Sequence, residues 1–182
     1  MIGSLRSSTA RRTALLVAIA VLFILASLGV LYSTGAFETR FRQEAVAERG
    51  AGVMPFDLEK TTHVFEATGS GGVEKVTADD PADNEQISLI REHLREEVSK
   101  FGRGDFSDPA AIHGEDMPGL KELEAGAERI DFRYAELPNG AQIEYATDDP
   151  ALVSALHRWF EAQLTDHGEH ASPGDGQHPS HH

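Results

Sequence analysis

The chain has 182 residues, a formal net charge of −14 and no cysteine. The excess of acidic side chains argues against a nucleic-acid-binding protein, because phosphates require a basic surface. The lack of cysteine excludes disulfides, thiolate catalysis and a lipid-modified cysteine anchor.

The N-terminal part contains a long uncharged segment, residues 13–32 (TALLVAIAVLFILASLGVLY). At 1.5 Å per residue, about 20 residues match the hydrocarbon core of a bilayer. Arg6, Arg11 and Arg12 precede it, so residues 1–12 are expected in the cytoplasm and the rest on the periplasmic or extracellular side. The segment predicts a single-pass protein of the cytoplasmic membrane. A retained anchor is favoured over a cleaved signal peptide because the apolar run is long.

Beyond this segment, Phe37 and Phe41 have the i, i+4 spacing of a helix that continues as a stalk over residues 33–52. A soluble domain is expected over residues 53–168. Residues 169–182 form a tail rich in His, Pro, Gly and Ser, whose composition predicts disorder.

Alternating and helical hydrophobic patterns predict four strands and two long helices in this domain. In chain order the expected elements are strands 61–67 and 73–78, a helix from 79 to 101, short helices at 110–113 and 120–125, strands 130–134 and 142–147, and a helix from 148 to 167. The Asn139-Gly140 pair predicts a type I′ hairpin turn.

An internal repeat organises these elements. Residues 77–82 (TADDPA) match residues 146–151 (ATDDPA), and each copy follows a hairpin and opens an amphipathic helix that ends at Gly. Helix positions Leu94, Val98 and Gly102 then correspond to Phe160, Leu164 and Gly168. The predicted fold is therefore α+β: an N-terminal transmembrane helix, then a duplicated ββα-ββα domain whose four-stranded antiparallel sheet carries both helices on one face.

Histidine is the residue type that most suggests chemistry, with nine in the chain. The candidate metal ligands of the domain are His63, His93, His113, Asp116 and Met117. Imidazole with a thioether suits copper, and imidazole with a carboxylate suits zinc. No pair has a diagnostic metal-binding spacing, so the alternative is that these histidines are structural or exposed. His157, at the edge of the last helix, is interpreted as structural.

The tail, counted from His167 onward, contains the other five histidines. Histidine-rich tracts bind Zn²⁺, Cu²⁺ or Ni²⁺. Metal scavenging and a solvated tail without a role both remain open for this segment.

No catalytic motif occurs: the chain lacks a Gly-x-Ser-x-Gly elbow, a phosphate-binding loop and a dinucleotide fingerprint. The leading hypothesis is a membrane-anchored envelope protein that binds copper or zinc through histidines. The alternative is a non-catalytic interaction module or accessory subunit of a membrane complex, with a protein partner in the envelope. An enzyme comes last.

Several short segments of the domain also carry a resemblance. They are residues 54–58 (MPFDL), 61–65 (TTHVF), 104–109 (GDFSDP), 112–114 (IHG) and 117–120 (MPGL). Over about residues 53–170 the chain resembles a group of small exported bacterial proteins of unknown function that carry the label aspartate carbamoyltransferase. Such a transferase binds carbamoyl phosphate through a Ser-Thr-Arg-Thr loop, which this sequence lacks, so the resemblance implies export and a shared domain but no catalytic residue.

Overall fold

A computed structural model describes the backbone of residues 5–174 and the side chains of residues 16–25 and 35–174. The chain divides into two compact units, residues 1–41 and residues 42–182. The elements are α1 (Leu5–Val53), β1 (Thr61–Thr68), β2 (Gly71–Ala78), α2 (Asn84–Phe101), α3 (Ser107–His113), α4 (Leu120–Gly126), β3 (Asp131–Leu137), β4 (Gly140–Ala146), α5 (Pro150–His167) and β5 (Ala171–Pro173).

The predicted membrane anchor is not supported. A search of the described residues finds no helix that is both long and apolar enough to cross a membrane. The side chains of residues 13–15 and 26–32 lie outside the described set. The prediction of a single-pass membrane protein with its C-terminal domain outside the cytoplasm is therefore not supported.

The second unit begins earlier in the chain than expected, because the last turns of α1 pack into it. Val46, assigned from sequence to a stalk over residues 33–52, is 1% exposed within the core. The Arg49 side chain donates a hydrogen bond to the carbonyl oxygen of Ile112 at 2.6 Å. Residues 42–52 therefore belong to the folded domain.

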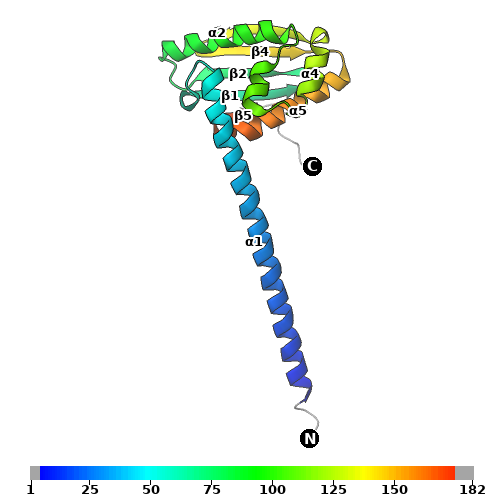
Figure 1. The fold of residues 1–182 in the computed structure, drawn as a ribbon. Coiled ribbons are helices and arrows are strands. Elements are labelled where there is room, and N and C mark those ends of the chain that lie inside the picture. The colour runs from blue at the N-terminus through cyan, green and yellow to red at the C-terminus, as the bar shows by residue number, and fades with distance from the viewer. Residues whose placement is uncertain (1–4, 175–182) are drawn as a thin grey trace. The chain divides into compact units, whose positions relative to one another are not determined.

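The sheet of this unit has five strands in the order β3-β4-β2-β1-β5, and it is mixed (Figure 1). The prediction of a four-stranded antiparallel sheet is wrong, because β5 pairs parallel to β1, with His63 opposite Ala171. Gly168 ends α5 with φ +56°, a conformation that favours glycine, and the chain then returns along the edge of β1. Pairing with β5 satisfies edge groups of β1 that would otherwise lack partners. Residues 175–182 of the expected tail lie outside the described residues.

The register of the two central strands follows the internal sequence repeat. β2 and β4 pair antiparallel from Gly71 opposite Ala146 to Thr77 opposite Gly140. In the repeat, Gly71 is equivalent to Gly140 and Thr77 to Ala146, so the pairing is symmetric with respect to the two copies. A Cβ on Gly71 would lie 2.0 Å from the carbonyl oxygen of Tyr145, and a Cβ on Gly140 would lie 2.0 Å from that of Val76. Glycine at both positions lets the two hairpins join into one sheet.

The turn between β3 and β4 differs from the predicted type I′ turn. Leu137 pairs with Gly140, which leaves Pro138 and Asn139 as the central residues. Proline holds φ near −65°, and no described non-glycine residue has a positive φ. A type I′ turn needs positive φ at both central residues and is therefore excluded.

The two long helices cover the same face of the sheet, each over the hairpin of the other copy. α2 packs mainly on β4 and β3, whereas α5 packs on β2 and β1 (Figure 1). Asp149 caps α5 as the repeat predicts, but α2 begins at Asn84, where Asp83 accepts a hydrogen bond from the backbone N–H of Gln86. Residue 77 matches residue 146 but Leu94 matches Phe160, so the first copy has three extra residues in between, and a turn at residues 81–82 precedes α2.

Candidate functional site: a histidine-lined cavity

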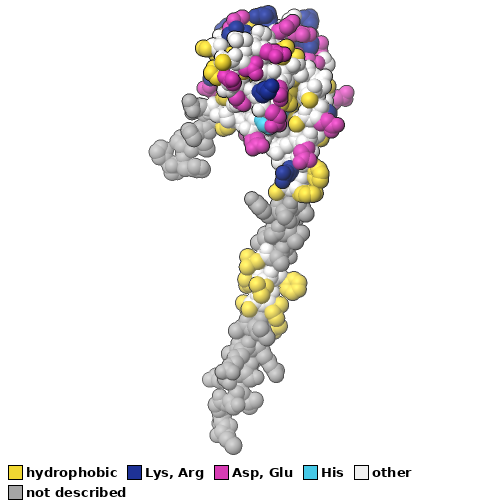
Figure 2. All heavy atoms as spheres, turned by 90° about the vertical axis from the view of Figure 1, so that its left-hand side faces the viewer, with side chains coloured by type: hydrophobic (Ala, Val, Ile, Leu, Met, Phe, Trp, Pro, Cys, Tyr) yellow, Lys and Arg dark blue, Asp and Glu magenta, His cyan; other side chains and the backbone are white. Residues whose placement is uncertain are grey.

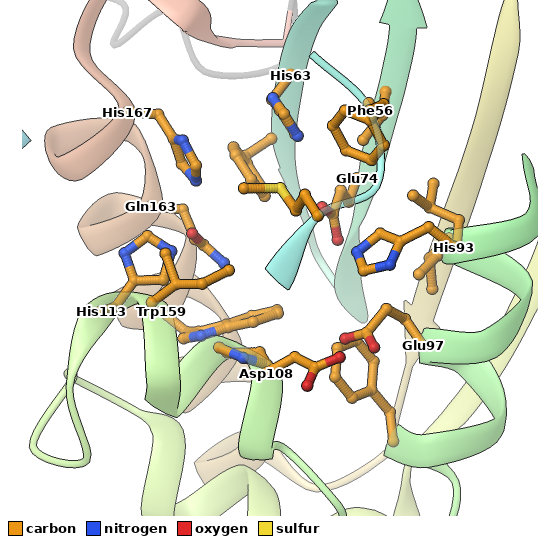
Figure 3. Close-up of a pocket in the computed structure, with 18 residues that line it drawn as sticks. Phe56, His63, Glu74, His93, Glu97, Asp108, His113, Trp159, Gln163 and His167 are labelled. Carbon is orange, nitrogen blue, oxygen red and sulfur yellow. The ribbon is translucent and has the colours of Figure 1, made fainter. Parts of the chain in front are cut away.

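A small cavity lies between α2 and α5, over the sheet, and residues of α3 also line it (Figure 3). Its volume is about 50 Å³. The lining side chains come from every element that surrounds it: Met54, Phe56, His63, Phe65, Glu74, Val76, His93, Leu94, Glu97, Phe101, Asp108, Pro109, Ile112, His113, Ile143, Trp159, Gln163 and His167. A cavity of this size holds an ion or a few water molecules, whereas pockets for organic ligands typically measure about 300–1,000 Å³.

The structure brings three of the five sequence-predicted site residues to this cavity: His63, His93 and His113. The other two lie elsewhere. Met117 is a core residue with 4% exposure, and Asp116 lines a separate surface hollow. The sequence analysis missed His167, the last residue of α5, because it was counted as the start of the tail.

His63, His113 and His167 form one cluster at the α5 end of the cavity (Figure 3). The ring centroids of His63 and His167 are 5.0 Å apart, and those of His113 and His167 are 5.1 Å apart. Imidazoles bound to one tetrahedral ion at about 2.05 Å have centroids roughly 5 Å apart. In the present rotamers, no group of three or more His, Cys, Asp or Glu among the described residues is arranged to hold a metal ion.

His113 is oriented by a buried carboxylate. Its Nδ1 lies 2.9 Å from Asp166 Oδ2, and Arg42 donates a hydrogen bond to the same oxygen at 2.8 Å. Burial opposes ionisation of Asp166, but the hydrogen bonds from His113 and Arg42 outweigh it and lower its pKa to about 2. Asp166 can accept the Nδ1 proton of His113, and in that tautomer Nε2 has the free lone pair. Metal-ligating histidines are commonly oriented in this way.

His63 and His167 are held in the neutral form by their surroundings. Burial lowers the pKa of His63 to about 4, and nearby histidines lower it further. Burial and the neighbouring His63 and His113 rings place the pKa of His167 well below its usual value. Neutral imidazole is the form that binds a metal ion, because ligands must be deprotonated.

The opposite end of the cavity is acidic. His93 and Glu97, one turn apart on α2, lie near Asp108 of α3, and Phe56 separates them from His63 (Figure 3). Burial and a hydrogen bond with Asp108 raise the pKa of Glu97 to about 8.

Glu74 also lines the cavity, and the fully buried Tyr145 donates a hydrogen bond to it at 2.6 Å. Burial raises the pKa of Glu74 to about 7, although this hydrogen bond lowers it. The cavity therefore contains two carboxyl groups, Glu74 and Glu97, whose pKa values are raised to near neutral pH.

Buried polar atoms that make no hydrogen bond concentrate at this cavity, although one of them, Glu97 Oε1, lies 3.4 Å from Lys100 Nζ. Among the described residues, four buried side-chain atoms make no hydrogen bond: His63 Nδ1, Glu97 Oε1, Trp159 Nε1 and Gln163 Oε1. All four belong to residues that line the cavity. An unsatisfied buried polar group costs about 1–3 kcal/mol. Such a concentration is typical of a site that binds water or an ion.

The lining follows the internal repeat. With the offset that aligns Leu94 with Phe160, the equivalent pairs are His93 with Trp159, Glu97 with Gln163, Lys100 with Asp166 and Phe101 with His167. The cavity thus lies where the two copies meet. The same alignment places His167 opposite the buried Phe101, which is the signal that would have assigned its side chain to the core rather than to the tail.

Among the described residues, every histidine of the second unit is buried or partly buried. On the face shown in Figure 2, acidic and basic side chains are interspersed and little histidine is visible. His157, outside the cavity, lies 3.0 Å from the carbonyl oxygens of Thr68 and Gly71, which agrees with its structural interpretation.

Comparison with known proteins finds no matching protein-family model, no matching curated protein and no matching solved structure. The resemblance of residues 53–170 to small exported bacterial proteins stays a prediction.

Proposed function

We propose that the second unit binds a borderline transition-metal ion, Zn²⁺ or copper, in the histidine-lined cavity. The observation that carries this proposal is the convergence of three imidazoles, from β1, α3 and α5, on a cavity too small for an organic substrate. The ligands would be His63, His113 and His167. Rotation of the rings about their side-chain torsions would direct one nitrogen of each toward a common point.

The chemistry of the donor set supports such an ion. Imidazole nitrogens are suitable ligands for Zn²⁺ and Cu²⁺, and the thioether of Met54, which lines the same cavity, adds a soft ligand that suits Cu⁺. The Gln163 oxygen offers a neutral acceptor. Asp166 would act behind His113 as a positioning residue.

The test uses the full chain with the three histidines of residues 178–182 replaced by serine, so that the tail does not compete for metal. Trp159 is the only tryptophan and lines the cavity, so bound Cu²⁺ should quench its fluorescence. We expect saturation at one equivalent. At 100 times Kd, binding should stabilise the fold by about 2.7 kcal/mol, raising the melting temperature by roughly 5–10 °C.

His63→Gln and His167→Gln should each abolish stoichiometric quenching. His157→Gln is the matched control, because that histidine bonds backbone carbonyls outside the cavity. Asp166→Asn should weaken binding about 10–100-fold, the usual effect of losing a group that orients a metal-bound histidine. Equal binding by the unaltered chain and His63→Gln, or no saturable binding at all, would overturn the proposal.

A second candidate function is an interaction module, and a different observation favours it. The exposed large hydrophobic side chains among the described residues all lie in α1, at residues 16–25 and at Phe37 and Phe41. A helix with this much exposed apolar surface gains stability by contacting a protein partner. Sedimentation velocity of the full chain should show an associated species that Phe37→Ser/Phe41→Ser dissociates. A monomer in both would exclude self-association through this surface.

A further inference from the structure

An acidic surface groove adjoins the cavity. Its lining includes Glu92, Glu96, Lys100, His93 and Asp108, and the last two also line the cavity. With three carboxylates and one ammonium, the groove has a formal charge of −2 if histidine is neutral. A negative concave surface concentrates cations and accelerates their binding.

Two other surface hollows have no such connection. One is bordered by Arg42, Asp116 and Asp166, and the other by Asp105, Ser107 and neighbouring residues; neither shares a lining residue with the cavity. The acidic groove is therefore the best-placed of these hollows to lead inside.

Lys100 lies where the groove meets the cavity. Its Nζ is 2.6 Å from Asp108 Oδ2 and 3.4 Å from carboxylate oxygens of both Glu96 and Glu97. The side chain is only 20% exposed, and its hydrogen bond with Asp108 raises its pKa, so it remains an ammonium ion. A tethered cation thus occupies the position that a metal ion would pass.

The same contact holds one end of α3, which contributes Asp108 and His113 to the lining of the cavity. Asp108, in the first turn of α3, is held by Lys100 of α2, and His113, at its last residue, is held by Asp166 of α5. The ion pair at Asp108 is the more exposed of the two contacts: its side chains are 20% and 24% exposed, against 2% for both His113 and Asp166. The Lys100 end of α3 is therefore the easier end to release.

We propose that the metal ion reaches the cavity from the acidic groove past His93 and Asp108, and that Lys100 is the residue that controls this access. This inference rests on the proposed function. An arriving cation takes the place of the Lys100 ammonium beside Asp108 and Glu97, the side chain swings into the groove, and the ion moves on to the three histidines. Lys100 thereby sets the rate of binding, whereas the histidines set the affinity.

Stopped-flow quenching of Trp159 by Cu²⁺ tests this route, in the full chain with serine at the tail histidines. Lys100→Met keeps the length of the side chain and removes its charge, so the association rate constant should rise roughly tenfold, within the range of electrostatic effects on association. The equilibrium affinity should change much less. Lys75→Met is the matched control, because Lys75 forms an ion pair with Glu66 at 3.1 Å and is not among the residues that line the groove.

Lys100→Arg provides a second test that does not depend on how Lys100→Met folds. A guanidinium binds a carboxylate through two hydrogen bonds, so the association rate should fall at least threefold. If both variants show saturable quenching, with association rates within twofold of the rate of the unaltered chain, the access route is overturned and the proposed function is not. Absence of saturable quenching in the unaltered chain would overturn the proposed function as well.

Discussion

Glu97 gives the domain a stability that should decline as the pH rises. The residue is 5% exposed, and burial together with the hydrogen bond to Asp108 raises its pKa from 4.5 to about 8. Because the folded-state pKa is above the unfolded value, the contribution to stability is complete below pH 4.5 and is lost as the pH rises through 8. Glutamine cannot ionise, so we expect Glu97→Gln to remove this contribution to the pH dependence of the free energy of unfolding.

The magnitude follows from linkage. Between pH 4.5 and 8 the folded state holds one more proton than the unfolded state, so the free energy of unfolding falls by at most about 1.4 kcal/mol per pH unit. Lys100 lies 3.4 Å from the carboxyl group and favours its charged form, so we expect about 1 kcal/mol per unit. From pH 5.5 to 7.5 the unaltered chain should lose about 2 kcal/mol relative to Glu97→Gln.

Urea denaturation of the metal-free protein at a series of pH values measures this difference. Glu96→Gln is the matched control, because it removes a carboxylate from the same helix whose side chain is 62% exposed. Its profile should run parallel to that of the unaltered chain. If the Glu97→Gln profile also runs parallel from pH 5.5 to 7.5, Glu97 is ionised in the folded state and the reasoning about its burial is refuted.

Two further substitutions test the fold and the support of the site. Gly140→Ala should destabilise the second unit by about 2 kcal/mol or more in urea denaturation, because its Cβ would meet a strand carbonyl at 2.0 Å. Gly69→Ala, with no atom within 4 Å of its Cβ, is the control, and equal stabilities would contradict the argument. Asp166→Asn should cost about 3 kcal/mol, since it leaves Arg42 and His113 without a buried carboxylate. A loss below 1 kcal/mol would show that this triad contributes little to the fold.

The repeated hairpin–helix order was predictable because its signals are local. The apolar stripe of α5, the Asp149 cap and the alternation of β3 are each formed by residues only a few positions apart in the chain. β5 was not predictable in the same way. Its three residues, Ala-Ser-Pro, have no strand pattern, and it forms because Gly168 returns the chain to the edge of β1.

The site was predictable only in part. His63, His93 and His113 were chosen by residue type, and the topology brings them to one cavity. The pairing of His113 with Asp166 joins residues 53 positions apart, which no local pattern can indicate. Asp116 was chosen because it follows His113 closely in the chain, but Gly114, with φ +102°, turns the backbone after α3 and Asp116 faces a different hollow.

The internal repeat has a consequence for how such a cavity can change. In a symmetric dimer of a single ββα unit, every substitution appears twice, so both ends of a cavity between the copies must carry the same residues. In one chain the copies vary independently: Phe101 occupies the position that is His167 in the other copy, and His93 occupies that of Trp159. Because both copies lie in one chain, the cavity between them can have histidines at one end and carboxyl groups at the other. Each end can also be altered without altering the other.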